Sequence, residues 1–471
     1  MRGRLWWPVA ALVVTIFGFA AMSPAQVAFP DARGYGANAT GWRNGRILKV
    51  TNTRDSGPGS LRDCLQVAKG PRVCLVETDG TIDLDHGIFV NPDVYLAGQT
   101  APGDGIQLRL SGRDDGASPL IVKNSNDVVI RFVKSRPGPS AAPSPSVSAL
   151  LIENSHDVML DHLSLMFATD QVFSIHIEGG SAHDITLQNS IVAWGLQNAN
   201  HPKGKHSKGA LVCSATKAGV AAGERCGRVT LWGNLFAHNN DRNPDIHSTG
   251  EPIEIVSNVF YNAKSQFGEF YDHYGDTRVN YAGNVARRGP STNRFRAPYS
   301  VQAFDYNPRT SVSVYVYANT NDDYRPTLEG AEALVVDPAH RGGIVTGPFM
   351  PMTDMIAPPG SLLDALADRV GTILPDGRLR DALDARVVAQ VINRTGSVID
   401  HQDDVGGYPE LRAGKAPRDT DGDGMPDEWE VALTGLQMAK FDAWDDRDGD
   451  GWSNIEEYLS VVAGDMPNPR R

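Results

Sequence analysis

Two twelve-residue segments near the carboxyl end of the chain, residues 419–430 and 446–457, carry oxygen-bearing side chains at positions 1, 3, 5, 9 and 12. Position 6 is glycine in both segments. Calcium prefers about six to eight hard oxygen ligands, and the turn that points alternate side chains at one ion needs glycine there. The spacing predicts two calcium loops, each completed by the backbone carbonyl of position 7, with the ligands Asp419, Asp421, Asp423, Met425, Asp427, Glu430, Asp446, Asp448, Asp450, Trp452, Asn454 and Glu457.

The same region concentrates negative charge, with thirteen acidic and two basic residues between positions 419 and 457. Its net charge of about −11 nearly equals the formal −12 of the whole chain, so the rest is close to neutral. A solvated acidic tail is the alternative interpretation. Disorder would not explain the glycines or the apolar residues Trp429, Leu433, Trp452, Ile455 and Leu459. The loop pair resembles the calcium modules of dockerins and thrombospondin type 3 repeats, which implies a calcium-binding module able to bind a protein partner.

Basic residues gather in two places on the nearly neutral part of the chain. One group consists of Lys203, Lys205, Lys208 and Arg242. If the segments around positions 208 and 242 lie in adjacent turns of a repeat, this group predicts a site for an anionic partner. A second group would extend the strip further, as suits a polymer, and comprises Arg287, Arg288, Arg294 and Arg296.

A sequence pattern that recurs along the chain predicts the elements that would position these residues. A strand-like alternation of apolar and polar residues begins at positions 126, 156, 183, 227, 252 and 277, with one longer step that holds an insertion. A fixed period of this size is typical of a stacked repeat. We therefore predict an all-β protein, a parallel β-helix in which each turn adds a short strand to each of about three sheets.

Most copies of this pattern end in a polar residue at a similar place, giving the series His162, Asn189, Asn234, Asn258 and Asn284. An asparagine at the same bend of successive turns can hydrogen-bond its neighbours and satisfy buried backbone groups. We therefore predict an internal ladder. The alternative, unrelated surface turns of a β-sandwich, does not explain why asparagine recurs in register.

The amino terminus and the cysteines bear on where the protein works. Arg2 and Arg4 precede an apolar run over residues 5–22, and a small-x-small sequence ends at Ala25, which predicts a cleaved secretory signal over residues 1–25. An uncleaved membrane anchor is the alternative. No second apolar stretch follows, so we expect a soluble monomer that is secreted, periplasmic or at the cell surface. Two short separations favour disulfides 64–74 and 213–226 over buried thiol pairs for the set Cys64, Cys74, Cys213 and Cys226.

Six ordered motifs resemble the pectate lyases of polysaccharide lyase family 1 over roughly residues 27–330. They lie at residues 29–40, 55–62, 97–105, 160–162, 206–208 and 240–244. The resemblance implies a right-handed parallel β-helix and β-elimination on polygalacturonate, pectin or a similar acidic plant polysaccharide. It implies that Arg242 is the catalytic base, that Lys208 binds the sugar carboxylate, and that Asp161 and His162 are mostly structural. Further substrate-binding residues would be Lys203, Lys205, His206, Asn239 and Asp241.

The chemistry asks for these residue types. Removal of the C5 proton beside a carboxylate requires the charge of that carboxylate to be neutralised, which a calcium ion or a lysine can do. Arginine alone is a poor base because its pKa exceeds about 12, so crowding by calcium and Lys208 would have to favour neutral Arg242. The alternative is a structural role, in which Arg242 holds Asp241 or Asp245 in place through an ion pair.

This chain has fewer acidic residues on the wall of the active site that binds calcium in the family. Asp170 matches one acidic position and is the predicted metal ligand there. Other positions where acids or a further arginine are expected carry Ser146, Ser148, Gln171, Ser174, Asp245 and His247. Three interpretations follow: calcium arrives with the carboxylates of the substrate, the enzyme is calcium-independent in the manner of a pectin lyase, or the substrate is a different uronan.

We expect four parts: a signal over residues 1–25, a catalytic β-helix over 26–345, a linker with a helical cap over 346–417 that covers the open end of the coil, and the EF-hand-like calcium module over 418–471. The predicted function is a polyuronate lyase with calcium as cofactor and no nucleic acid or membrane partner. A non-catalytic polysaccharide-binding protein is the main alternative. A hydrolase would need paired carboxylates, for which Asp170 and Asp241 are the candidates.

Overall fold

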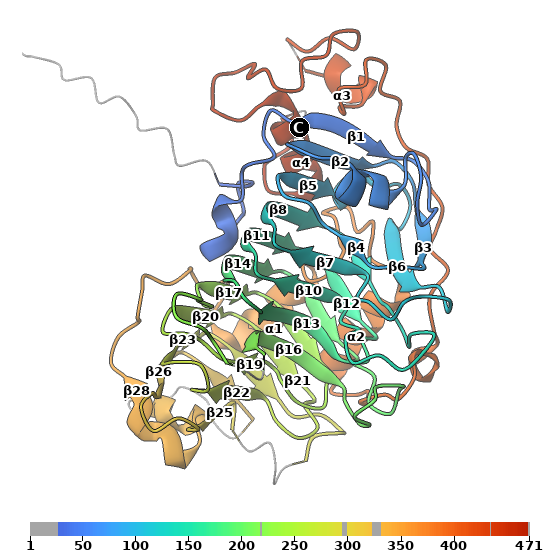
Figure 1. The fold of residues 1–471 in the computed structure, drawn as a ribbon. Coiled ribbons are helices and arrows are strands. Elements are labelled where there is room, and N and C mark those ends of the chain that lie inside the picture. The colour runs from blue at the N-terminus through green and yellow to red at the C-terminus, as the bar shows by residue number, and fades with distance from the viewer. Residues whose placement is uncertain (1–26, 217–218, 294–298, 323–330, 434, 470–471) are drawn as a thin grey trace, which may run out of the picture.

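Three parallel sheets wind around one axis in the computed structural model, which describes residues 27–216, 219–293, 299–322, 331–433 and 435–469 (Figure 1). Internal strands pair in parallel with the strands one turn earlier and one turn later. The predicted right-handed parallel β-helix is therefore confirmed. The predicted signal segment lies outside the described residues, and among those described no helix is long and apolar enough to cross a membrane.

Each sheet collects one strand from each turn. The eleven-stranded sheet contains β1 (Arg46–Val50), β2 (Arg72–Val76), β5 (Val94–Ala97), β8 (Asn126–Arg131), β11 (His156–Asp161), β14 (His183–Gln188), β17 (Val229–Trp232), β20 (Pro252–Val256), β23 (Thr277–Ala282), β26 (Val312–Tyr317) and β28 (Ile344–Val345). The nine-stranded sheet contains β3 (Gly80–Leu84), β6 (Ile106–Leu110), β9 (Lys134–Ser135), β12 (Ser164–Met166), β15 (Ile191–Ala193), β18 (Leu235–Ala237), β21 (Val259–Tyr261), β24 (Val285–Arg287) and β27 (Thr320–Asn321). The eight-stranded sheet contains β4 (Ile88–Phe89), β7 (Leu120–Lys123), β10 (Leu150–Glu153), β13 (Gln171–Ile177), β16 (Lys208–Ala215), β19 (Asp245–Ile246), β22 (Gly268–Tyr271) and β25 (Val301–Phe304).

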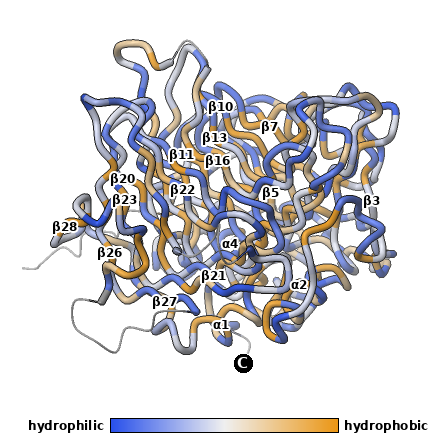
Figure 2. Tube along the Cα trace, turned by 90° about the horizontal axis from the view of Figure 1, so that it is seen from below, coloured by the Kyte–Doolittle hydropathy of each residue, from blue (hydrophilic) through white to orange (hydrophobic). Residues whose placement is uncertain are grey.

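The core forms because every second residue of a strand points into the coil. In the eight-stranded sheet the inward positions of three successive turns are paired in register and fully buried, and they carry Leu120, Leu150, Phe173, Val122, Ile152 and Ile175. Apolar residues recur along the strands while the connecting loops are largely hydrophilic (Figure 2). The intervening residues face outward, so the outer face of this sheet is free to carry polar chemistry.

An internal ladder of amides follows the bend after the eleven-stranded sheet. The backbone N–H of each member donates to the side chain of the next at 2.9 Å, through Ser190, Asn234, Asn258, Asn284 and Asn319. The prediction was wrong for His162 and Asn189, which lie one position earlier in the bend, at φ 53° and 49°. Their side chains instead contact Asp161, at 2.8 and 2.9 Å.

Both predicted disulfides form. Cys64, in the short helical segment η2 (Asp63–Val67), is bonded to Cys74 in β2. Cys213 in β16 is bonded to Cys226, just before β17. The second disulfide closes the base of the long insertion and so ties one turn to the next.

The helices after the coil do not cover its end, contrary to our expectation. Apolar residues of α1 (Pro359–Ala367) and α2 (Ala382–Asn393) pack with outward-facing residues of the nine-stranded sheet, in a cluster that includes Leu362, Leu366, Val387, Val391, Ile191, Leu235 and Val259. Asp381 caps α2 by accepting bonds from the N–H groups of Leu383 and Asp384, and it pairs with buried Arg136 at 2.6 Å. The helices lie along the side of the coil because that sheet is apolar on both faces.

The carboxyl-terminal segment, which includes α3 (Asp427–Val431) and α4 (Asn454–Ala463), packs on the outer face of the first turns of the eleven-stranded sheet (Figure 1). Trp429, Ile455 and Leu459 share a buried cluster with Val73 and Tyr95. Polar contacts reinforce this packing, between Lys49 and Asp419 at 2.9 Å, Arg43 and Glu456 at 2.5 Å, and Arg131 and Asp465 at 2.7 Å. The remaining short helical segments are η1 (Tyr35–Asn38), η3 (Gly98–Thr100), η4 (Ala331–Val335), η5 (Pro338–Gly343) and η6 (Gln402–Val405).

We expect Asn258→Ala to destabilise the fold by about 3 kcal/mol, because it removes the side-chain acceptor of the buried Asn234 N–H and the bonds that the Asn258 amide donates to the Leu231 carbonyl and to Asn284. Asn393→Ala, at an exposed position, is the matched control. The measurement is the denaturant midpoint of each variant. Equal midpoints for the two variants would show that the ladder adds nothing to stability.

Candidate active site

Charged residues converge where four successive loops leave the nine-stranded sheet and enter the eight-stranded sheet. The register pairs Gln171 with Lys208, Lys208 with Asp241, and Asp245 with Glu269. Residues far apart along the chain therefore become lateral neighbours. The loops before β13, β16 and β19, together with the start of β22, form the candidate site.

Two ion pairs join the predicted catalytic residues to adjacent acids. Lys208 Nζ lies 2.6 Å from Asp241 Oδ2, and Arg242 Nε lies 3.2 Å from Asp245 Oδ2. Lys208 pairs in register with Gln171, the neighbour of Asp170, and with Asp241, the neighbour of Arg242. Lys208 and Arg242 therefore lie on adjacent turns at one site, although Arg242 also makes the contact with Asp245 that we considered as its structural alternative.

Beneath Arg242 lies a buried acid, Glu269, that the sequence analysis missed. Its Oε1 accepts a bond from the Arg242 backbone N–H at 2.9 Å, and its Oε2 accepts one from the Tyr271 hydroxyl at 2.9 Å. Burial, followed by the carboxylates of Asp241 and Asp245, raises its pKa to about 7. No motif marks this residue, since only the pairing of β19 with β22 brings it beside Asp245.

Asp170 lies against two imidazoles. His201 Nε2 is 3.6 Å and His206 Nε2 is 3.5 Å from Asp170 Oδ1, and the two rings stack with centroids 3.5 Å apart. Burial raises the pKa of Asp170 to about 6, lowers that of His206 to about 4 and also lowers that of His201. One carboxylate and two nitrogen ligands do not fit calcium, which prefers several hard oxygens.

The other predicted binding residues divide into two kinds. Lys203 and Lys205 are exposed on the loop before β16, with His206 partly exposed beside them. Asn239 was predicted wrongly, because it is fully buried and its amide bonds the N–H of Gly195 and the carbonyl of Val192. Arg287 was also misplaced, since it donates to the carbonyl of Val391 at the end of α2. Arg294 and Arg296 lie outside the described residues.

The first carboxyl-terminal loop does fit calcium. Carboxylate oxygens of Asp419, Asp421 and Asp423 converge, and Asp423 also converges with Glu430 and Asp442. Both oxygens of Glu430 and one of Asp442 are buried without a hydrogen-bond partner. Burial and the surrounding carboxylates raise the pKa of Glu430 to about 7, a cost that a bound cation would remove.

Two features of the loops differ from the predicted ligand set. Asp442 was not predicted because it lies beyond the first loop, whereas Asp427 bonds the N–H and hydroxyl of Thr420 at 2.8 Å. In the second loop Asp446, Asp448 and Asp450 converge at an exposed position, and buried Asn454 has an oxygen without a partner. The main chain of Met425 lies within the first loop and that of Trp452 within the second.

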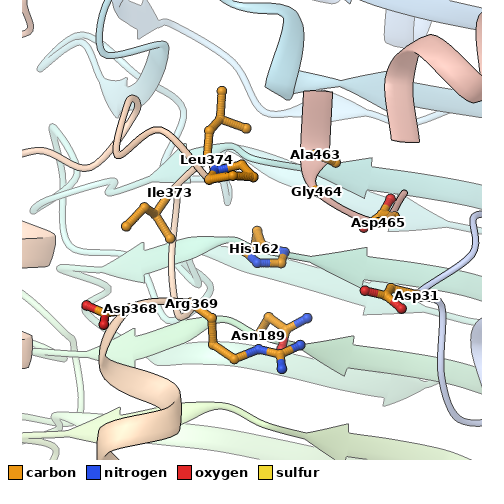
Figure 3. A pocket seen from close by; sticks show the side chains of 11 residues that line it. Asp31, His162, Asn189, Asp368, Arg369, Ile373, Leu374, Ala463, Gly464 and Asp465 are labelled. Carbon is orange, nitrogen blue, oxygen red and sulfur yellow. The ribbon is translucent and has the colours of Figure 1, made fainter. Parts of the chain in front are cut away.

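The Asp161–His162 motif lies elsewhere, beside a cavity of about 250 Å³ where α1, the carboxyl-terminal segment and the amino-terminal segment meet (Figure 3). Asp161 accepts bonds from Arg131, Gln188 and Asn189. Its role as a buried acceptor explains why the motif is structural, as the resemblance implied.

The fold and the site together define a parallel β-helix protein with Lys208 and Arg242 on loops that enter one sheet. Jun a 1, the major allergen from cedar pollen, has a similar fold, with a TM-score of 0.51, 12% identity, and coverage of 72% of this chain and 92% of that chain. No protein-family model matches the chain.

Relatives in sequence define the family. The probable pectate lyase C of Aspergillus flavus is 33% identical over 447 residues, 93% of this chain and 94% of that protein. The probable pectate lyase C of Emericella nidulans is 32% identical over 449 residues, again 93% and 94%. The chain therefore belongs to the pectate lyase family.

We expect Glu269→Gln to flatten the pH dependence of stability. A carboxyl group whose pKa is raised by folding stabilises the fold below its unfolded value of 4.5, and that contribution is lost as the pH rises through about 7. The wild type should lose on the order of 3 kcal/mol over this interval that the variant retains. Denaturant unfolding at both ends of the interval tests this, with exposed Glu410→Gln as control.

We expect Asp419→Ala combined with Asp446→Ala to lower the melting temperature in calcium by roughly 5 °C or more, because calcium that binds only the folded state stabilises it. Chelation should lower the wild type to a similar value. Rates measured well below the transition should stay within about twofold of the wild type. Loss of turnover by a still-folded variant would contradict this division of roles between the calcium loops and the candidate active site, and Glu410→Ala is the control.

Proposed function

We propose that the protein cleaves polygalacturonate or a similar acidic plant polysaccharide by β-elimination and leaves an unsaturated sugar at the new end. The placement of Lys208 and Arg242 on adjacent turns, where successive loops enter the eight-stranded sheet, carries this proposal. The relatives named as pectate lyases support it over nearly the whole chain. A non-catalytic binding protein remains the alternative, and it would form no unsaturated product.

In the proposed reaction the uronate carboxylate binds beside Lys208, with Lys203 near it. Loss of the C5 proton pushes electrons toward that carboxylate, and the positive charges stabilise the enolate-like transition state. The electrons then form the double bond between C4 and C5 as the bond from C4 to the glycosidic oxygen breaks, and that oxygen leaves as a hydroxyl group after taking a proton from water. Since the donor set around Asp170 does not suit calcium, lysine supplies this charge in our proposal and a chelator does not stop the reaction.

Arg242 is the proposed proton acceptor, on the strength of its match to the family motif. Its Nε also lies 3.2 Å from Asp245 Oδ2. His206 is the competing acceptor. Its Nδ1 lies 3.0 Å from the Lys205 carbonyl and donates to it, which leaves a lone pair on Nε2 toward Asp170.

We also propose that the chain is secreted and that the carboxyl-terminal loops bind calcium to stabilise the first turns of the coil. The apolar face of this module packs on the chain itself, through Trp429, Ile455 and Leu459. That packing supports a stabilising role over the capture of a separate protein partner.

We expect Arg242→Ala to lower turnover of polygalacturonate by at least about a thousandfold without changing the melting temperature. The measurement is the ultraviolet absorbance of the unsaturated product, with and without chelator, beside an assay of reducing ends. If His206→Gln abolishes turnover and Arg242→Ala does not, the imidazole is the base. Reducing ends without absorbance would indicate hydrolysis, for which the adjacent acids Asp245 and Glu269 are the candidates.

A further inference from the structure

Six aromatic rings cover the outer face of the last turns of the eight-stranded sheet. His247 follows β19, Tyr271 ends β22 and Phe304 ends β25, so they point outward from three successive turns. The His247 and Tyr271 centroids are 5.1 Å apart, and those of Tyr271 and Phe304 are 4.7 Å apart, with ring planes within 20° and 13°. We call this set the aromatic platform: His247, Tyr271, His273, Tyr274, Phe304 and Tyr306.

The aromatic platform is open to solvent at its outer end. Tyr306 is 60% exposed, and its ring centroid lies 4.3 Å from that of His273, which is also exposed. Phe304 and Tyr271 are partly exposed beneath them. Because the inner rings stack on one another, the exposed ring of Tyr306, tilted by 34° to Tyr271 and by 47° to His273, is the member that can offer a face to a ligand.

The platform is continuous with the candidate active site. The Tyr271 hydroxyl donates to Glu269, and Glu269 in turn accepts the backbone N–H of Arg242. The platform begins with His247 in the same turn as Arg242, on the other side of β19, and continues one turn further at Tyr271. Strands of a sheet lie about 4.8 Å apart, so the platform runs along the same outer face. A polymer bound at Lys208 and extended along the coil would reach these rings.

The charge along this path changes sign. At one end Lys208 and Arg242 lie on adjacent turns, and exposed Lys203 lies on the loop before Lys208. At the other end the carboxylates of Asp245 and Glu269 border the inner rings, and exposed Asp305 precedes Tyr306. An anionic uronate is favoured at the first position and repelled at the second, whereas the C–H face of an uncharged sugar ring can stack on the aromatic rings.

We propose that the aromatic platform is a subsite for uncharged sugar residues, either methyl-esterified uronates or neutral sugars, of the chain whose free carboxylate binds at Lys208. This inference rests on the proposed function. It makes the preferred substrate a partly esterified or branched polysaccharide, in which charged and uncharged residues alternate in blocks. Tyr306 supplies the stacking surface, Phe304 supports the rings beneath it, and Tyr271 holds Glu269 between the two regions.

The kinetic test compares Tyr306→Ala with the wild type on partly methyl-esterified pectin and on polygalacturonate. We expect KM to rise about tenfold on the esterified polymer and less than about threefold on polygalacturonate. Tyr306→Trp should restore the wild-type ratio because it keeps an aromatic face. Tyr317→Ala removes an aromatic residue of similar exposure, 48%, from the eleven-stranded sheet and is the control. Equal changes of KM on both polymers, or none, would overturn the inference.

A binding test separates this inference from the proposed reaction. Calorimetric titrations of the folded wild type and Tyr306→Ala would use a fully methyl-esterified oligogalacturonide and a neutral galacto-oligosaccharide. Weaker binding by the variant supports the platform even if the wild type forms no unsaturated product, in which case the proposed function fails alone. Loss for the esterified ligand only identifies methyl esters, and loss for both identifies any uncharged sugar. Equal affinities of the variant and the wild type for both ligands would remove the subsite.

Discussion

The parallel register between successive turns is the constraint on which the rest of the structure depends. Lys208 and Asp241 are bridged across neighbouring strands although 33 positions separate them along the chain. The same stacking places Asp245 beside Glu269 and aligns Tyr271 with Phe304. A shift of one residue would turn these side chains into the core. The inward-facing apolar rows and the amide ladder resist such a shift, because both require the native alignment of every turn.

Features with a period were predictable from the sequence, and features that depend on a single tertiary approach were not. The repeat spacing gave the β-helix, and the cysteine spacing gave both disulfides. His162 and Asn189 were wrongly assigned to the ladder, because each lies one residue before the ladder position, in a left-handed backbone conformation. The sequence does not show which of two neighbouring residues in a bend points inward. Asn239 was mistaken for a binding residue for a related reason, since a sequence motif does not show which side of a loop is buried.

The residues that were missed share a different property. Glu269, His201 and Asp442 have no motif of their own and gain a partner only when another segment folds against them. The position of α1 and α2 was missed similarly, because their apolar faces could pack against the end of the coil or along its side. The outward-facing apolar residues of the nine-stranded sheet decide between the two, and the alternation of short strands does not reveal them.

The packing of the last part of the chain on the first turns of the coil has a consequence for the order of folding. Val73, Tyr95, Val129 and Met159 form an outer apolar face that residues near Trp429 and Leu459 cover. During synthesis the residues of this face are made hundreds of residues before the segment that packs on them. Until that segment is made, the apolar surface of the first turns is open to water or to a chaperone. The first turns of the coil are therefore covered only after the carboxyl-terminal residues have been synthesised.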